Sequence, residues 1–137
     1  MANAVQRLYR PELFQGEPNL RRGGSGYFEG WYFKVASDDG AWAFIPGVSL
    51  AGADSHCFLQ VNGPEGSAYH RYGLEEFAFA SEPFSIRVGP NRFSLERLHV
   101  EAPGTAADLD LRVHARWPSA PFAPTSMGWY AFAGFME

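Results

Sequence analysis

The stretch GYFEGWYFKV, residues 26–35, has the alternating side chains of a β-strand whose two faces differ. Successive side chains of a strand point to opposite faces of its sheet. One face then carries Tyr27, Glu29, Trp31, Phe33 and Val35. The other face carries Phe28, Gly30, Tyr32 and Lys34. Because the first face is the more apolar apart from its one carboxylate, we expect it to face the interior, with Glu29 between Tyr27 and Trp31.

Further strand-like segments follow along the chain, separated by turn signals. Apolar or alternating segments occupy 41–50, 55–61, 67–72, 74–80, 84–88, 92–102 and 108–117, and a last one follows the proline-rich loop 118–126. Glycine, proline, asparagine and aspartate gather between them, as is typical of turns. We expect Pro46-Gly47 to break or bulge its strand. A bulge near Glu96-Arg97 would reconcile a change in the apolar phase of 92–102.

About eight strands joined mainly by turns, with no convincing helix, predict an all-β fold. We expect an antiparallel lipocalin-like barrel or half-barrel, because closure removes sheet edges and can enclose a pocket. A β-sandwich is the alternative. Residues 1–26 read as a polar lead-in ending in the hinge-like RRGGSG, and residues 27–137 as the β domain.

Composition and charge exclude several classes of function. The net charge is −4 and no basic run is longer than Arg21-Arg22, so the footprint needed to bind nucleic acid is missing. The single cysteine, Cys57, rules out an intrachain disulfide, and the histidines show no metal-ligand spacing. We expect no metal and no cofactor. No apolar run reaches the ~20 residues of a membrane helix, and the N-terminus lacks the apolar core of a signal peptide. These features predict a cytoplasmic protein, with peripheral membrane contact left open.

The chemistry of the opening stretch centres on Glu29. A carboxyl group among aromatic rings loses hydration, which favours its neutral form, and a neutral acid can donate a proton. The π faces of neighbouring rings stabilise a cation. Such a site is suited to protonating an alkene and sheltering the resulting carbocation. Two other interpretations remain: Glu29 points outward and pairs with a basic residue, or it is a structural acceptor for tyrosine and tryptophan donors.

Two more groups are candidates for a site. Trp129 and Tyr130 repeat the Gly-Trp-Tyr pattern of 30–32, and either complete an aromatic lining or belong to the core. His56 and Gln60 share a face with Phe58, where they could orient a phenol hydroxyl. A structural histidine with satisfied hydrogen bonds is the alternative.

The motif at 26–35 resembles the tocopherol cyclase family, including its uncharacterised bacterial members. Other segments match in order: AFIPGVSL (43–50), SHCFLQV (55–61), PFSIRVGPNRFSLE (83–96) and MGWYAFAGFME (127–137). The resemblance implies a lipocalin-like barrel and an isomerase that closes the chromanol ring of a prenylated hydroquinone. In that reaction an acid protonates the prenyl double bond and the phenolic oxygen captures the cation, without a metal or redox cofactor.

Together, the residues and the resemblance predict Glu29 as the catalytic acid. The expected substrate-binding residues are Tyr27, Trp31, Tyr32, Phe33, His56, Gln60, Trp129 and Tyr130. Family members continue into a second β half, and this chain stops within an apolar strand, so we expect an N-terminal part whose missing C-terminal half is a partner. Two functions without this chemistry stay open: a lipid- or isoprenoid-binding module, and a carbohydrate-binding surface, which requires an exposed Trp31 or Trp129.

Overall fold

The computed structural model describes residues 10, 12–23 and 25–111. A short helix, α2 (Glu17–Arg21), precedes ten strands. The first sheet contains β1 (Ser25–Gly30), β2 (Phe33–Ser37), β3 (Gly40–Ala51), β4 (His56–Gly63) and β5 (Gly66–Gly73). The second sheet contains β6 (Phe77–Ser81), β7 (Phe84–Val88), β8 (Asn91–Ser94), β9 (Arg97–Ala102) and β10 (Thr105–Asp110). Short 3₁₀ turns, η1 (Gly52–Asp54) and η2 (Leu74–Glu76), follow β3 and β5.

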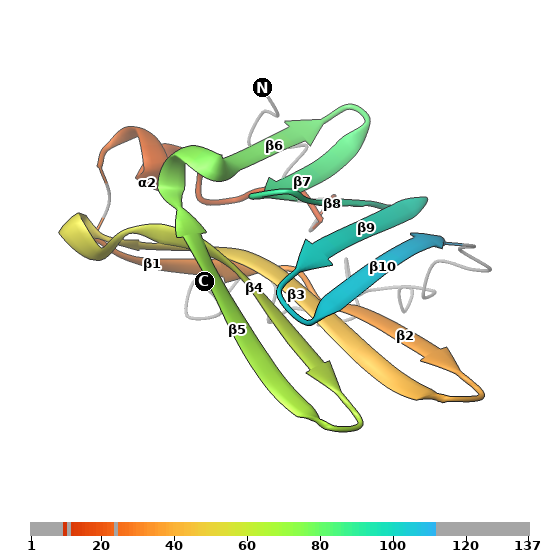
Figure 1. The fold of residues 1–137 in the computed structure, drawn as a ribbon. Coiled ribbons are helices and arrows are strands. Elements are labelled where there is room, and N and C mark those ends of the chain that lie inside the picture. Colours follow the sequence, from red (N-terminus) through yellow and green to blue (C-terminus); the bar gives the residue numbers. More distant parts are fainter. Residues whose placement is uncertain (1–9, 11, 24, 112–137) are drawn as a thin grey trace, which may run out of the picture.

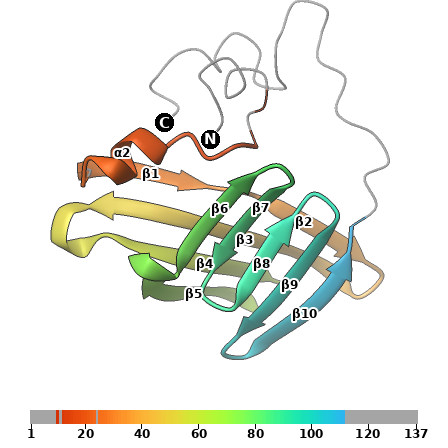
Figure 2. The same cartoon turned by 90° about the horizontal axis from the view of Figure 1, so that it is seen from above.

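The two sheets form two facing layers (Figures 1 and 2). The first sheet has the order β1-β3-β4-β5, with β2 also paired to β3, and the second is a meander from β6 to β10. All of these pairings are antiparallel, which confirms the all-β prediction. Within residues 25–111 each strand pairs only inside its own sheet, so this part of the chain is not a closed barrel.

The core lies between the layers and follows the alternation of the strands. In β7, Phe84, Ile86 and Val88 are buried while the residues between them are partly exposed. They meet apolar residues of the first sheet that are also almost fully buried, including Val48, Cys57 and Leu59. Burial on one face and solvent on the other is the usual pattern of antiparallel sheets.

The predicted strand at 27–35 is split into β1 and β2, whereas β3 runs through Pro46-Gly47 without the expected break. The Trp31 N–H donates to the Pro46 carbonyl oxygen at 2.9 Å. In an antiparallel strand the nitrogen and the oxygen of one residue point to the same neighbour. The Pro46 nitrogen, which has no hydrogen to donate, therefore faces the gap between β1 and β2. The break that was expected in β3 therefore lies in the neighbouring strand, between the end of β1 at Gly30 and the start of β2 at Phe33.

The change of phase within 92–102 is a turn, so the predicted bulge is wrong. Strands β8 and β9 form a hairpin in which Phe93 lies opposite Leu98. The Ser94 hydroxyl oxygen accepts hydrogen bonds from the N–H groups of Glu96 and Arg97, at 3.3 and 2.9 Å. Serine commonly closes turns through such bonds to the following backbone. The two apolar parities belong to two different strands.

The N-terminal segment differs from the polar lead-in that the sequence predicts. Leu13 and Phe14 are buried in the core, and Glu17 forms an ion pair with Arg21 along α2, at 2.7 Å. No helix was expected here. At the other end, most of the predicted strand 108–117 lies outside the described residues. Within β10 the predicted alternation holds, because Leu109 packs against the core and Asp108 is exposed.

Candidate functional site

Glu29 points to the inner face of the first sheet, as its place in the sequence predicts. Its carboxylate accepts hydrogen bonds from the backbone N–H of Gln15, at 3.0 and 3.1 Å, and of Gly16, at 3.0 Å. The Tyr27 hydroxyl donates to it at 2.6 Å. The segment before α2 thus places two backbone donors on a side chain of β1. Glu29 connects the N-terminal segment to the first sheet.

Aromatic rings lie beside this carboxylate. Tyr27 and Trp31 are both buried, with exposed fractions of 9% and 8%. Phe14 lies 6.1 Å from the Trp31 ring, 5.2 Å from Phe77 and 4.7 Å from Phe79, between ring centroids. Sequence reasoning missed Phe14, Phe77 and Phe79, since they come from the lead-in and from the other sheet. The buried Trp31 does not fit a carbohydrate-binding surface.

The geometry around Glu29 favours its ionised form. Hydrogen bonds donated to a carboxylate stabilise the charged state, and two backbone amides and a phenol donate here. The arrangement matches the alternative of a structural acceptor. A proton on Oε1 would displace the Gln15 N–H from that oxygen, while Oε2 could keep its donors.

The remaining predicted residues do not gather around Glu29. Tyr32 is 66% exposed, and Phe33 packs on Phe93 of the second sheet, with 5.3 Å between ring centroids. Glu29 lies opposite Val48, and Val48 lies opposite Cys57, so these three side chains share the inner face of the first sheet. His56 and Gln60 lie one and three residues from Cys57, and the alternation of the strand puts them on the outer face. Trp129 and Tyr130 lie outside the described residues.

His56 has its hydrogen bonds satisfied within the chain. Its Nδ1 lies 2.7 Å from the backbone oxygen of Asp54, which can only accept, so Nδ1 carries the proton. The Tyr69 hydroxyl then donates to Nε2 at 2.9 Å. Burial raises the pKa of Tyr69. His56 therefore orients the phenol of Tyr69, a residue of the same chain. This matches the alternative prediction of a structural histidine with satisfied hydrogen bonds. Gln60 donates to the Asn62 side chain at 3.0 Å.

An aromatic stack crosses the outer face of the first sheet. The Phe58 ring lies between Phe28 and Tyr69, at 5.4 and 5.1 Å and with nearly parallel planes. Phe58 also lies against Gly47, where a Cβ atom would come within 2.3 Å of the ring. Gly47 is thus required for the close approach of this ring. Because the rings stack on one another, the interior ring has no free face to offer a ligand.

The thiol of Cys57 is not a nucleophile in the folded chain. Cys57 is fully buried, and its sulfur donates to the Gly73 carbonyl oxygen at 3.2 Å. Burial raises the pKa of Cys57 to about 11, so the thiol is protonated at neutral pH. Reactive cysteines need an exposed thiolate with a low pKa.

A cleft opens between the sheets at the end opposite Glu29, and we name it the hairpin cleft. It has a volume of about 810 Å³ and lies among the hairpins β2–β3, β4–β5 and β9–β10. Its apolar wall consists of Val35, Trp42, Phe44, Val61, Ala107 and Leu109. Phe44 and Val61 are buried at its floor, and the exposed Asp39 and Glu65 stand at its rim.

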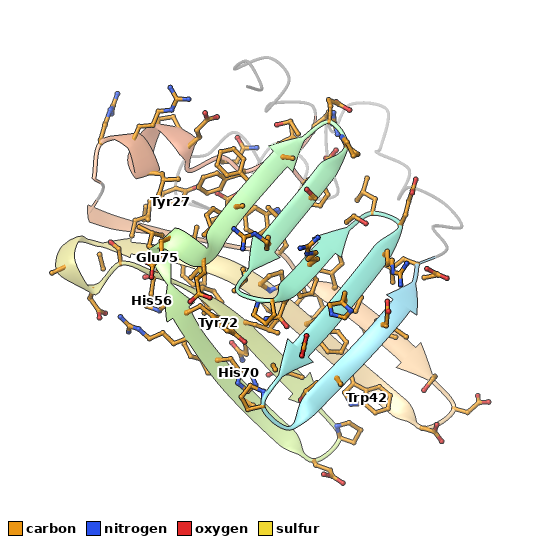
Figure 3. All side chains as sticks on the ribbon, turned by 45° about the horizontal axis from the view of Figure 1, so that its top comes forward. Tyr27, Trp42, His56, His70, Tyr72 and Glu75 are labelled. Carbon is orange, nitrogen blue, oxygen red and sulfur yellow. The ribbon has the colours of Figure 1, made fainter. Side chains whose placement is uncertain are left out.

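Glu29 does not line this cleft. Glu29 lies opposite Val48 of β3, whereas the nearest cleft residue of β3 is Phe44. A rise of about 3.3 Å per residue separates these two positions by roughly 13 Å along the strand. Figure 3 shows Tyr27, beside Glu29 in sequence, and Trp42, in the cleft, at opposite ends of the first sheet. The predicted acid and the cavity are separate features.

Trp42 is held in place by a glycine. Its indole lies across Gly63 of β4, where a Cβ atom would be 2.8 Å from Cδ1 of the ring. The ring is partly buried and packs against the edge of the core. Sequence reasoning missed this residue, because only the register that places Trp42 beside β4 brings its ring to the cleft.

In the described part of the chain, Nε2 of His70 is the one buried side-chain polar atom without a hydrogen bond. It lies on β5 two positions beyond Ala68, which lines the hairpin cleft from the same face of the strand. Figure 3 shows His70 on β5 between Tyr72 and the open end of the sheets. Buried polar atoms are nearly always hydrogen-bonded, so this nitrogen is a position where water or a ligand hydroxyl gains a partner.

Among residues 10, 12–23 and 25–111, no group of His, Cys, Asp and Glu side chains is arranged to hold a metal ion. The same residues contain no helix with the length and apolar character to cross a membrane. Comparison with known proteins gave no match: no family model, no curated protein and no solved structure is significantly similar to this chain.

Proposed function

We propose that this chain binds an elongated apolar small molecule, of the isoprenoid or prenyl-lipid class, in the hairpin cleft. The observation that carries this proposal is the apolar wall between the two sheets. Small-molecule sites are typically apolar cavities of about 300–1,000 Å³ with a few polar groups. The cleft, at about 810 Å³, falls in that range. The space between the sheets also supports a lipocalin-like relationship, in which a barrel opened at one side holds its ligand.

The distribution of charge gives the ligand an orientation. Phe44 and Val61 form an apolar floor, and carboxylates at the rim face water. An apolar tail gains free energy by leaving water for the floor, at about 25 cal/mol per Å². The polar group of the ligand would then stay at the rim, beside water. A prenyl alcohol or prenylated phenol satisfies both requirements.

The test is fluorescence titration with farnesol. Trp42 lies in the cleft, so binding changes its emission, and the change disappears in Trp42→Phe although the other three tryptophans remain. Ala68→Asp places a charge at an exposed position of the lining and weakens binding by at least about tenfold, because the apolar tail would have to desolvate a carboxylate. Ala80→Asp is the matched control, on an exposed strand position away from the cleft. Equal affinities of the two variants would refute the cleft as the site.

We propose as a second candidate the cyclase-like isomerase that the resemblance implies, with Glu29 as the acid. It is supported by the inward direction of Glu29 on β1 and by its buried same-face neighbours Tyr27 and Trp31. The chain would protonate the prenyl double bond of a hydroquinone and release a chromanol. Chromatography of a prenylated hydroquinone after incubation separates the two candidates. Bound but unchanged substrate supports the binding module, and chromanol that disappears in Glu29→Gln supports the isomerase.

A further inference from the structure

The outer face of the second sheet carries a row of basic side chains that sequence order does not reveal. Arg87 of β7 lies opposite Arg92 of β8, and Arg92 lies opposite His99 of β9. Directly opposed residues have Cβ atoms about 4.5–5.5 Å apart, and like charges in this position destabilise the sheet. The hairpins thus bring together two guanidinium groups that repel each other.

These two arginines have no counterion in the part of the chain that the structure describes. Other arginines there do form ion pairs: Arg10, Arg21, Arg71 and Arg97. The nearest carboxylate of β10 is already engaged, because Asp108 accepts two hydrogen bonds from Arg97, at 3.0 and 2.9 Å. Arg92 is exposed and Arg87 is partly buried. Their charge is therefore available to an external anion.

The surface beside Arg92 is hollow. A depression of about 630 Å³ is lined by Ser85, Pro90, Arg92, Phe93, Ser94, Arg97, His99 and Glu101. Ser85 lies opposite Ser94, two residues from the arginine pair along each strand and therefore on the same face. The hollow therefore offers hydroxyl and guanidinium donors beside Arg92, while its imidazole, His99, lies 3.9 Å from Glu101 and 3.7 Å from Asp108.

We propose that this depression binds a phosphate group, held by Arg92, with Arg87 on the neighbouring strand as a second positive charge beside the site. A guanidinium presents a planar fork of N–H donors that matches the oxygens of phosphate, and a doubly charged anion relieves the repulsion between two cations. The group can belong to a free phosphorylated small molecule or to a lipid headgroup. The site lies on the opposite side of the second sheet from the hairpin cleft and does not depend on the proposed function.

The first test measures thermal unfolding in inorganic phosphate against sodium chloride of equal ionic strength. The wild-type melting temperature should rise with phosphate and saturate, as expected for a ligand of the native state. In Arg92→Gln the rise should be lost, with an apparent affinity at least about tenfold weaker. Without phosphate this variant should melt no lower than the wild type, because a repulsive contact has been removed. Arg71→Gln, an exposed strand arginine of the first sheet, should keep the phosphate response.

The second test identifies the source of the phosphate. Sedimentation with phosphatidylcholine vesicles that contain phosphatidic acid, compared with vesicles lacking it, detects a lipid headgroup. Arg92-dependent binding to these vesicles without a response to free phosphate assigns the site to lipid. A response to free phosphate without vesicle binding assigns it to a soluble ligand. The proposal is overturned if the wild type responds to neither, or if Arg92→Gln responds as the wild type does.

Discussion

Replacing Glu29 by glutamine tests whether its carboxylate is a structural acceptor. The carboxylate accepts from the N–H groups of Gln15 and Gly16 and from the Tyr27 hydroxyl. Glutamine keeps one acceptor oxygen and adds an NH₂ group that can only donate. With the oxygen kept toward Gly16 and Tyr27, the NH₂ group would face the Gln15 N–H, which keeps only its 3.1 Å contact to that oxygen, and all three hydrogen bonds lose the charge of their acceptor.

The size of the effect follows from these contacts. A hydrogen bond to a charged group contributes about 1.5–3 kcal/mol, and an unsatisfied buried donor costs a similar amount. Because Glu29 is only partly buried, we take about 2 kcal/mol for the loss in free energy of unfolding. For a chain of this size that corresponds to a fall in melting temperature of roughly 6–10 °C.

Thermal and urea unfolding followed by circular dichroism at pH 7 measure this loss. Glu96→Gln is the matched control, because Glu96 is exposed in the β8–β9 turn and its side chain forms no hydrogen bond or ion pair within the described residues. Its stability should equal that of the wild type. If Glu29→Gln also unfolded like the wild type, the carboxylate would not hold the N-terminal segment, and the structural interpretation of Glu29 would be wrong.

Three further outcomes follow from the described contacts. Cys57 is fully buried and should resist alkylation until the chain unfolds. Burial raises the pKa of Cys57 to about 11, so the protonated thiol contributes stability that is fully present below the pKa of the unfolded thiol and is lost as pH rises through about 11. Cys57→Ala should not show this loss. The Arg97 hydrogen bond lowers the pKa of Asp108, so acid should remove stability as pH falls through that lowered value, and Asp108→Asn should flatten this part of a urea–pH profile. Gly47→Ala should cost about 1–3 kcal/mol in urea unfolding, because its Cβ would lie 2.7 Å from the Glu29 backbone oxygen, whereas Gly30→Ala, with nearest atoms at 3.5 Å, should cost clearly less.

The alternation of residues 26–35 was enough to predict which side chains are buried. Tyr27 and Trp31 lie in the core while Phe28 and Tyr32 are exposed, as a two-faced strand requires. The break between β1 and β2 could not be predicted in the same way. Its cause is Pro46, a residue of the neighbouring strand, and it acts through a register that local sequence does not contain.

The partners of Glu29 were beyond sequence reasoning for another reason. The side chain's direction follows from its parity in the strand, but two of its donors are backbone N–H groups, of Gln15 and Gly16. Every residue except proline carries such a donor, so the sequence does not reveal which backbone N–H groups lie at a site. Leu13 and Phe14 were missed because two apolar residues are too few to show a period.

The two proposed sites, the hairpin cleft and the depression beside Arg92, share this dependence on register. The hairpin cleft joins Val35, Trp42, Val61 and Leu109, and each comes from a different strand. The basic row joins arginines separated by one turn, which read as isolated charges along the chain. The absence of a basic run predicts that a long nucleic-acid footprint is missing, but it says nothing about a compact anion site.

Glu29 and the hairpin cleft make different demands on the chain. A proton donor at Glu29 must be neutral, whereas the observed carboxyl oxygens accept from the Tyr27 hydroxyl and from two backbone N–H groups before α2. A ligand in the cleft meets an apolar floor that is already formed, with Phe44 and Val61 in place. Binding therefore requires no rearrangement of hydrogen bonds among the described residues, whereas a proton on the Glu29 carboxyl disturbs at least the hydrogen bond accepted by the oxygen that carries it. This difference places binding ahead of catalysis.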